Sequence, residues 1–255
     1  MRRLQPIPCG TGWIMASLDG PATARRGWVF VTGGTQIRAG PHRLYARLAA
    51  ELGAQGEAVI RFDRRGVGDS PGDDPGFAES APEIAAAGAA LRGFAPGLEE
   101  VRGFGLCDGA TALALHGRAA GIGPLLLANP WAVPPRDDLP PAAAIRGHYA
   151  RRLADPAAWA RLVGGGVDLR RLARGLVRGA ARETSPLAAR IAAGLTAGSR
   201  LVLAEDDGTA QAFASAWAAL RPAPPAVPLL RIATASHSFA DAAGYAALSA
   251  LIRQR

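Results

Sequence analysis

The feature that most constrains the fold of this chain is an alternation of short, strand-like apolar runs with longer segments of helical period. Such alternation predicts an α/β fold, a mostly parallel sheet with helices on both faces. The strand-like runs span residues 13–18, 28–32, 58–62, 101–106, 124–128, 200–204 and 227–232. The helical segments span residues 41–53, 83–91, 109–120, 210–220 and 240–252. With 255 residues, 49% of them hydrophobic, the chain is long enough to bury such a core.

One stretch interrupts the alternation. From Val133 to about Gly198 there is no strand-like run, only a proline-rich entry followed by arginine-rich helical sequence. This stretch is much longer than an ordinary connection of a few residues. We therefore expect a helical cap inserted at 133–198 between two parts of one core, 1–132 and 199–255, with a plain pair of packing helices as the alternative.

The charge balance has a simpler cause than a nucleic-acid partner. The formal net charge is +8, but all 29 basic residues are arginine, and Gly and Pro are also abundant, as GC-rich coding would give. The arginines are scattered along the chain, and no basic motif is interleaved with aromatic residues. We expect no nucleic-acid partner.

The compartment is predicted from cysteine usage and from the apolar runs. Two cysteines leave no disulfide framework, which favours a reducing environment. The first residues lack the apolar stretch of about 7–15 residues that a signal peptide needs. No window approaches the roughly 20 apolar residues of a membrane helix. We expect a cytoplasmic chain without a membrane span.

The common serine-hydrolase signature, G-x-S-x-G, occurs once, around Ser70, and we reject it. In that sharp turn the residue after the nucleophile donates its backbone N–H to the developing oxyanion and opens a helix. Pro71 has no N–H and is followed by loop sequence. Ser70 is therefore not expected to be the nucleophile.

A cysteine version of the signature surrounds Cys107, directly after a strand-like run and directly before a helical, small-residue segment. The turn strains the backbone of the nucleophile, so glycines two residues before and after it remove clashing side chains. A small buried cysteine at a strand end is the alternative. The context predicts that Cys107 is the nucleophile, assisted by the N-terminus of the helix that follows.

A thiol nucleophile needs a base, and the expected chain order is nucleophile, acid, histidine. Of four histidines, only His237 lies in a loop after the last strand-like run. The acid is expected after the preceding run, where Glu205, Asp206 and Asp207 stand together. We choose Asp207, with Asp206 as the rival, to hold the imidazole tautomer and stabilise the imidazolium.

The oxyanion hole is predicted from two loops. Paired glycines after the run 28–32 let the N–H of Gly34 or Thr35 approach the substrate carbonyl, beside the N–H of Asp108. The Asp108 carboxylate is expected to point away or to meet a cation. The segment from Asp63 to Ser70 is expected to brace the oxyanion loop by hydrogen bonds.

Several stretches together resemble the exosortase A system-associated hydrolase 1 group of α/β-hydrolases. They are GGTQIRAGPHR, RFDRRGVGDSPG, GLCDGA, LANPW, GHYARRLADPAAWARLVGGGVD and ASHSF. The resemblance covers most of the chain. It implies an α/β-hydrolase fold with a helical cap and a Cys-Asp-His triad on Cys107, Asp207 and His237. Glu205 and Asp206 stand where a glycine is usual before the acid, which leaves the register of the acid open.

Three functions from different classes follow. The first is hydrolysis of a carboxylic ester or thioester through an acyl-cysteine. The second is transfer of the acyl group to an amine, thiol or hydroxyl, and the third is a catalytically silent binding module, which the complete triad disfavours. The expected partner is a small-molecule or carrier-bound acyl substrate, and neither a cofactor nor a metal is expected. Candidate substrate-binding residues are Arg38, Trp131, Tyr149 and Trp159.

Overall fold

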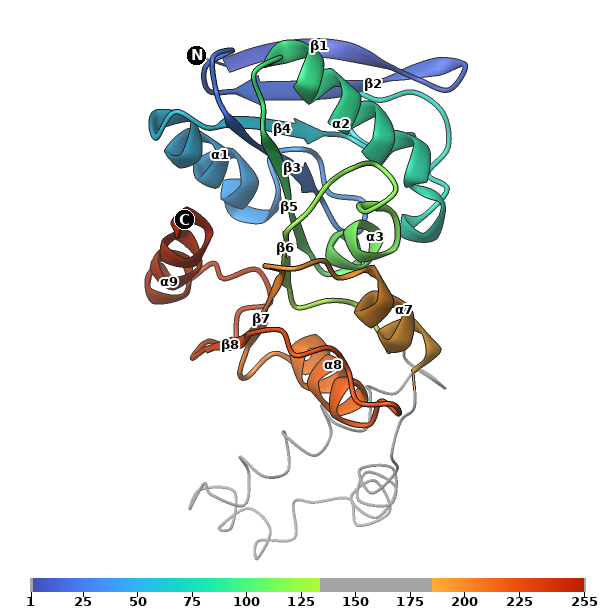
Figure 1. Cartoon of the computed structure of the whole chain (residues 1–255), viewed down its shortest axis with the longest axis vertical. Coiled ribbons are helices and arrows are strands. Elements are labelled where there is room, and N and C mark those ends of the chain that lie inside the picture. Colours follow the sequence, from blue (N-terminus) through green and yellow to red (C-terminus); the bar gives the residue numbers. More distant parts are fainter. Residues whose placement is uncertain (1, 134–184, 255) are drawn as a thin grey trace, which may run out of the picture.

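A computed structural model describes residues 2–133 and 185–254, which form one eight-stranded sheet with helices on both faces (Figure 1). The strands lie in the order β1-β2-β4-β3-β5-β6-β7-β8. β1 pairs antiparallel with β2, and β2 pairs antiparallel with β4; every other neighbouring pair is parallel. The strands are β1 (Arg2–Cys9), β2 (Gly12–Asp19), β3 (Arg26–Val31), β4 (Ala58–Phe62), β5 (Glu100–Leu106), β6 (Leu125–Ala128), β7 (Arg200–Ala204) and β8 (Leu229–Ile232).

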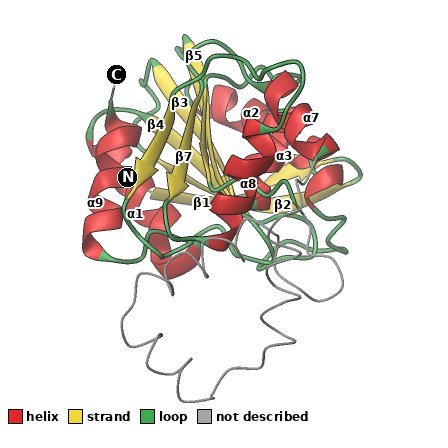
Figure 2. Cartoon of the chain, turned by 90° about the horizontal axis from the view of Figure 1, so that it is seen from below, coloured by secondary structure: helices red, strands yellow, loops and turns green. Residues whose placement is uncertain are grey.

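The helices form two layers, one on each face of the sheet (Figure 2). One layer holds α1 (Leu44–Ala54) and α9 (Ala242–Arg253). The other holds α2 (Ala81–Phe94), α3 (Asp108–His116), α7 (Pro186–Gly194) and α8 (Gly208–Ala218). Two short 3-10 helices, η1 (Pro41–Arg43) and η2 (Phe77–Glu79), lie in connections. The seven strands and five helices predicted from the sequence are all present, with ends that shift by a few residues.

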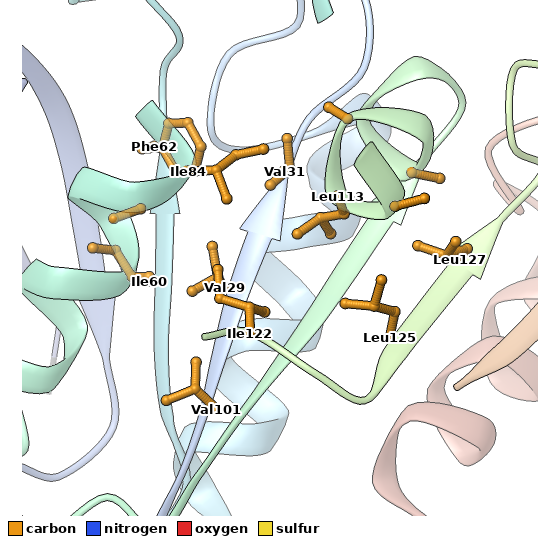
Figure 3. Close-up of a cluster of buried hydrophobic side chains, with 14 of the residues drawn as sticks. Val29, Val31, Ile60, Phe62, Ile84, Val101, Leu113, Ile122, Leu125 and Leu127 are labelled. Carbon is orange, nitrogen blue, oxygen red and sulfur yellow. The ribbon is translucent and has the colours of Figure 1, made fainter. Parts of the chain in front are cut away.

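Two apolar clusters hold the layers together, because side chains of a strand alternate between its faces. Val29 and Val31 of β3 point into the larger cluster, where Figure 3 shows them with Ile84 of α2 and Leu113 of α3. Trp28 and Phe30 point into the other cluster under α1 and α9. There the ring centroid of Phe30 lies 5.0 Å from that of Phe104 and 5.6 Å from that of Tyr45. Both faces of the central strand are therefore buried, as a parallel sheet requires.

β1 was not among the predicted strands, and it contains two residues that are unusual inside a strand, Pro6 and Pro8. The strand lies at the edge of the sheet and pairs only with β2, with Pro6 opposite Met15 and Pro8 opposite Trp13. An edge strand tolerates proline because one side of its backbone needs no partner. Pro6 and Pro8 thus fit an edge strand, and a turn at Gly10 and Thr11 joins that strand to β2.

Part of the predicted insertion packs on the core. Residues 134–184 lie outside the described residues, but α7 places Ala188 and Ile191 in the larger cluster. The helix also lies so close to α3 that a Cβ on Gly194 would stand 1.7 Å from the backbone oxygen of Ala114. Residues 186–194 therefore belong to the helical layer over the sheet. Among the helices described, none is long and apolar enough to cross a membrane.

Candidate active site

Cys107 forms the sharp turn between β5 and α3, at the carboxyl edge of the parallel strands. Its φ of 59° and ψ of −130° are strained values for a residue with a side chain. The backbone around it is fully engaged: the N–H of Cys107 donates to the oxygen of Ala128 at 3.0 Å, and its carbonyl accepts from Trp131 at 3.2 Å. The strain is therefore held by neighbouring backbone, and the thiol stands partly exposed.

The two glycines of the predicted signature are sterically required. A Cβ on Gly105 would stand 2.6 Å from the backbone nitrogen of Ala110, and one on Gly109 would stand 2.3 Å from the oxygen of Val31. Both distances are shorter than any ordinary contact of a Cβ. The spacing of the motif thus follows from close packing of α3 against β5 and β3.

His237 lies in the loop between β8 and α9, where its Nδ1 is 2.9 Å from Oδ2 of Asp207. The same oxygen accepts the N–H of Ala210, so Asp207 also caps the N-terminus of α8. Asp207 is 9% exposed, whereas Asp206 is exposed to solvent. The structure thus brings Asp207 and not Asp206 to His237. His116 lies elsewhere, with Nε2 2.9 Å from the oxygen of Ala78.

The surroundings of His237 favour its charged form. Burial alone would lower the pKa of His237, but hydrogen bonds to Asp207 and to Cys107, together with the negative charge of each, raise it to about 10. The imidazole therefore interacts with the carboxylate and with the sulfur at once. At neutral pH this arrangement favours an imidazolium that is paired with the carboxylate of Asp207.

Asn129 is a functional candidate that sequence reasoning missed. It follows β6, is fully buried and has a left-handed φ of 42°. Its Nδ2 donates to the oxygen of His237 at 2.7 Å, and its Oδ1 accepts from the N–H of Ala204 at 2.8 Å. Asn129 thereby fixes the loop of His237 to the ends of two strands. The signal in the sequence was an Asn-Pro pair directly after a buried strand.

Tyr45 of α1 is a second residue that the sequence did not reveal. Its hydroxyl donates to the oxygen of Val31 at 2.8 Å and accepts from the N–H of Leu106 at 2.9 Å, so it bridges the ends of β3 and β5. Burial raises the pKa of Tyr45 above its ordinary value, so the hydroxyl stays protonated and able to donate. The bridge fixes the strand end from which Cys107 projects.

Asp108 does not behave as predicted. Its Oδ1 accepts the N–H of Gly34 at 2.6 Å, so the carboxylate faces the 33–38 loop instead of pointing away. Within the described ranges it forms an ion pair with no cationic side chain, which corrects the expected contact with a cation. The N–H of Gly34, one of two predicted oxyanion donors, is therefore occupied in this structure. The second predicted oxyanion donor is the N–H of Thr35, which forms no hydrogen bond within the described part of the chain.

The predicted bracing of the 33–38 loop by the segment after β4 is confirmed. Arg64, only 2% exposed, donates through Nη2 to the backbone oxygen of Gly34 and lies 3.2 Å from Oδ2 of Asp74. Asp63, fully buried, accepts the backbone N–H of Arg38. These contacts join the 33–38 loop to the segment after β4 and set the orientation of the peptide groups of the loop.

Arg38 is engaged in the same support. Its guanidinium pairs with Asp63, lies 2.8 Å from Oδ2 of Asp69 and donates through Nε to Ser17 at 3.1 Å. Its side chain is 16% exposed. A guanidinium committed to two carboxylates and a hydroxyl is a structural brace, so this geometry argues against the predicted role of Arg38 in substrate binding.

Ser70 is buried, and its hydroxyl forms hydrogen bonds that support the fold. Its hydroxyl donates to the oxygen of Asp63 at 2.8 Å and accepts from the N–H of Met15 at 2.9 Å. It ties β2 to the end of β4, and no helix follows it directly. The rejection of Ser70 as nucleophile agrees with this geometry.

Of the predicted aromatic lining residues, Trp131 lies beside the turn. Its backbone contacts Cys107, its carbonyl accepts from the hydroxyl of Thr111 at 2.7 Å, and its side chain is partly exposed. Tyr149 and Trp159 lie outside the described residues. Trp131 therefore stays a candidate for contact with the acyl group.

A cavity of about 570 Å³ lies at the opposite, amino-terminal edge of the sheet. Its charged lining is largely satisfied: Arg102 lies 2.7 Å from Glu100, and Arg200 donates to Gln254 at 3.0 Å. Because Cys107 lies at the carboxyl edge of the sheet, this cavity is not the site of the reaction that involves Cys107. Across the described residues, no three His, Cys, Asp or Glu side chains are grouped to hold a metal ion.

Comparisons with known proteins support the fold. No family model and no curated protein matches the sequence. An α/β serine hydrolase without lid from Xanthomonas campestris matches with a TM-score of 0.64 and 15% identity, over 99% of this chain and 92% of that chain. A dienelactone hydrolase from Anabaena variabilis matches with a TM-score of 0.61 and 15% identity, over 99% and 94% of the two chains.

An esterase from Pyrococcus furiosus is also similar, with a TM-score of 0.64 and 10% identity, over 99% of this chain and 89% of that chain. This chain has the α/β-hydrolase fold. The predicted fold class is thereby confirmed, and the fold neighbours are hydrolytic enzymes. The narrower resemblance, to the exosortase A system-associated group, stays a prediction, as does the cysteine nucleophile.

Proposed function

We propose that this α/β-hydrolase cleaves a carboxylic ester or thioester through an acyl intermediate on Cys107. One arrangement supports the proposal: Cys107 lies on a strained turn, and His237, whose pKa is raised in part by a hydrogen bond to Cys107, lies 2.9 Å from Asp207. The raised pKa of His237, to about 10, supports an imidazolium that stabilises a thiolate. A thiolate is the reactive form of a cysteine nucleophile.

In the first half-reaction the Cys107 sulfur attacks the acyl carbon, and a C–S bond forms while the carbonyl oxygen becomes an oxyanion. The N–H of Asp108, at the start of α3, and the N–H of Thr35 are the donors best suited to this oxyanion. Arg64 holds the oxygen of Gly34. Because the peptide between Gly34 and Thr35 is planar, this contact turns the Thr35 N–H to the other side of the loop.

The oxyanion then collapses and the bond to the leaving group breaks. His237 gives its proton to the departing alkoxide or thiolate. In the second half-reaction His237 takes a proton from water, the hydroxide attacks the acyl carbon, and the C–S bond breaks to release the carboxylic acid. Asp207 keeps the imidazole in one tautomer throughout.

The cysteine also predicts a substrate order. A thiolate attacks thioesters and aryl esters readily, whereas an alkoxide or amide nitrogen leaves only after full protonation by His237. Turnover should therefore fall from thioesters and aryl esters to alkyl esters, with simple amides last. Efficient cleavage of a simple amide, with thioesters and aryl esters untouched, would overturn the proposal.

The test uses the two cysteines of the chain as an internal control. Burial raises the pKa of the Cys9 thiol, so alkylation should label Cys107 much faster and should abolish turnover. Cys107→Ala should lose at least about 10³-fold in kcat/KM, whereas Cys9→Ala and Ser70→Ala should remain active. Wild-type activity in Cys107→Ala would refute the proposal.

Intact mass during turnover of an acyl thioester then separates hydrolysis from transfer. Under hydrolysis the acyl adduct on Cys107 forms and disappears in water alone. An adduct that persists until an amine, thiol or hydroxyl acceptor is added would instead identify the enzyme as an acyltransferase.

A further inference from the structure

Asp108 places a carboxylate directly beside the reacting sulfur. It is the first residue of α3 and follows Cys107 in the chain, and its Oδ1 lies 2.6 Å from the N–H of Gly34. The position is open: Gly34 is exposed and Asp108 is partly exposed. A Cβ on Gly33 would stand 2.5 Å from Oδ1 of Asp108 and 3.1 Å from the Cβ of Cys107. The carboxylate therefore lies within a few ångströms of the site of attack.

The nearby described arginines do not neutralise this charge. Arg38 pairs with Asp63 and Asp69, and Arg64 pairs with Asp74. His237 is paired with Asp207. Among the described residues the carboxylate of Asp108 is thus held only by a backbone N–H, which leaves a net negative charge at the acyl site.

A neutral acyl group meets two disadvantages at this site. The carboxylate repels the negative charge that develops on the substrate oxygen in the transition state. The carboxylate also occupies the N–H of Gly34, which then cannot donate to that oxygen. Both disadvantages disappear if the substrate itself supplies a cation that pairs with Asp108.

We infer that the preferred substrates carry an ammonium group next to the reacting carbonyl, as aminoacyl esters and thioesters do. This inference rests on the proposed function of Cys107. The substrate ammonium pairs with the Asp108 carboxylate and draws it from Gly34, whose N–H is then free to join the oxyanion donors. Because this donor acts on the transition state, the preference appears in kcat as well as in KM.

The covalent steps remain those of the proposed hydrolysis. The Cys107 sulfur forms a bond to the aminoacyl carbon, the thiol or alcohol leaves with the proton of His237, and water releases the amino acid. The ammonium group keeps its protons throughout. Asp108 neither gains nor loses a bond, so its role is recognition.

The experiment compares acyl thioesters that share one thiol leaving group. Glycyl and propionyl thioesters form a matched pair, since an ammonium replaces a methyl of similar size, and a malonyl thioester supplies the anionic case. Rates are divided by the rate of uncatalysed hydrolysis by hydroxide, which removes the electronic activation caused by the ammonium. We expect a preference for glycyl over propionyl of at least about tenfold in kcat/KM, or about 1.4 kcal/mol, and the malonyl thioester should be the poorest substrate.

Two variants assign the preference to one carboxylate. Asp108→Asn keeps an oxygen that accepts from Gly34 but removes the charge, so the glycyl rate should fall, the propionyl rate should rise and the ratio should approach one. Glu99→Gln is the matched control, because it removes one exposed carboxylate that pairs with Arg25 at the amino end of β5. It should leave the ratio unchanged.

The outcomes separate this inference from the proposed function. If the wild-type enzyme cleaves all three thioesters through Cys107 without preferring glycyl, the inference fails and the hydrolase stands. A glycyl preference that survives in Asp108→Asn also overturns the role of Asp108. If no ester or thioester is cleaved at all, the proposed function fails and the inference fails with it.

Discussion

Replacing Asn129 should damage both the stability of the protein and the hydrolytic activity proposed for it. Its side chain is fully buried and joins the oxygen of His237, at 2.7 Å, to the N–H of Ala204, at 2.8 Å. In Asn129→Ala both backbone groups lose their partners, at about 1–3 kcal/mol each. Alanine is also less suited than asparagine to the φ of 42°, at roughly 1 kcal/mol. We expect the free energy of unfolding to fall by roughly 3–7 kcal/mol.

Asn129→Asp separates the two contacts. Aspartate tolerates the left-handed backbone and keeps an oxygen for the N–H of Ala204, but it cannot donate to the oxygen of His237 when ionised. We expect a smaller loss of stability than in Asn129→Ala and a clear loss of kcat, because the loop of His237 is no longer fixed. Urea unfolding followed by tryptophan fluorescence, with thioester hydrolysis at saturating substrate, measures both. If Asn129→Ala unfolds within 1 kcal/mol of wild type and turns over normally, the reasoning is refuted.

Two further predictions concern the partner groups of His237. Asp207→Asn should keep the cap of α8, because asparagine caps a helix as well as aspartate does. It should nevertheless lower kcat by about 10²–10⁴-fold, whereas Asp206→Asn should remain active. If Asp206 proves essential instead, the choice of Asp207 as the acid is wrong. The pKa of His237 is raised from 6.5 to about 10, so its ionic contribution to stability should be fully present below pH 6.5 and lost as the pH rises through about 10. The difference in urea midpoint between wild type and His237→Gln, measured across this range, should shrink with rising pH; a difference that grows would contradict the ion pairing.

Much of the fold was predictable because strand period and helical period alternate so regularly in this chain. The strand 58–62 and the strand 200–204 were predicted with the bounds that the structure shows. β1 escaped because Pro6 and Pro8 are acceptable only at a sheet edge, and sequence does not state which strand lies at an edge. The order of the strands depends on pairings between distant residues, which local patterns do not encode.

The residues of the candidate site were predictable where packing fixes the spacing of a motif. They were not predictable where a residue's role depends on the direction of its side chain. The glycines at 105 and 109 mark the turn because packing forbids side chains there. The choice between Asp206 and Asp207 rests on which of two neighbours faces inward, and a boundary error of one residue would exchange them. Asp108 shows the same problem, since its sequence position gives no sign that its carboxylate turns toward Gly34.

The charge of the whole chain is a poor guide to the charge at the reaction site. The formal net charge is +8, yet the arginines nearest the 33–38 loop are paired with carboxylates that support that loop. An ion pair that holds a loop has no net charge to offer a substrate, whereas the carboxylate of Asp108 contacts only a backbone N–H among the described residues. The sign of the net charge at the reaction site therefore depends on which charged side chains are already paired within the protein. In this protein that reasoning predicts attraction of a cationic acyl group, the opposite of what the composition suggests.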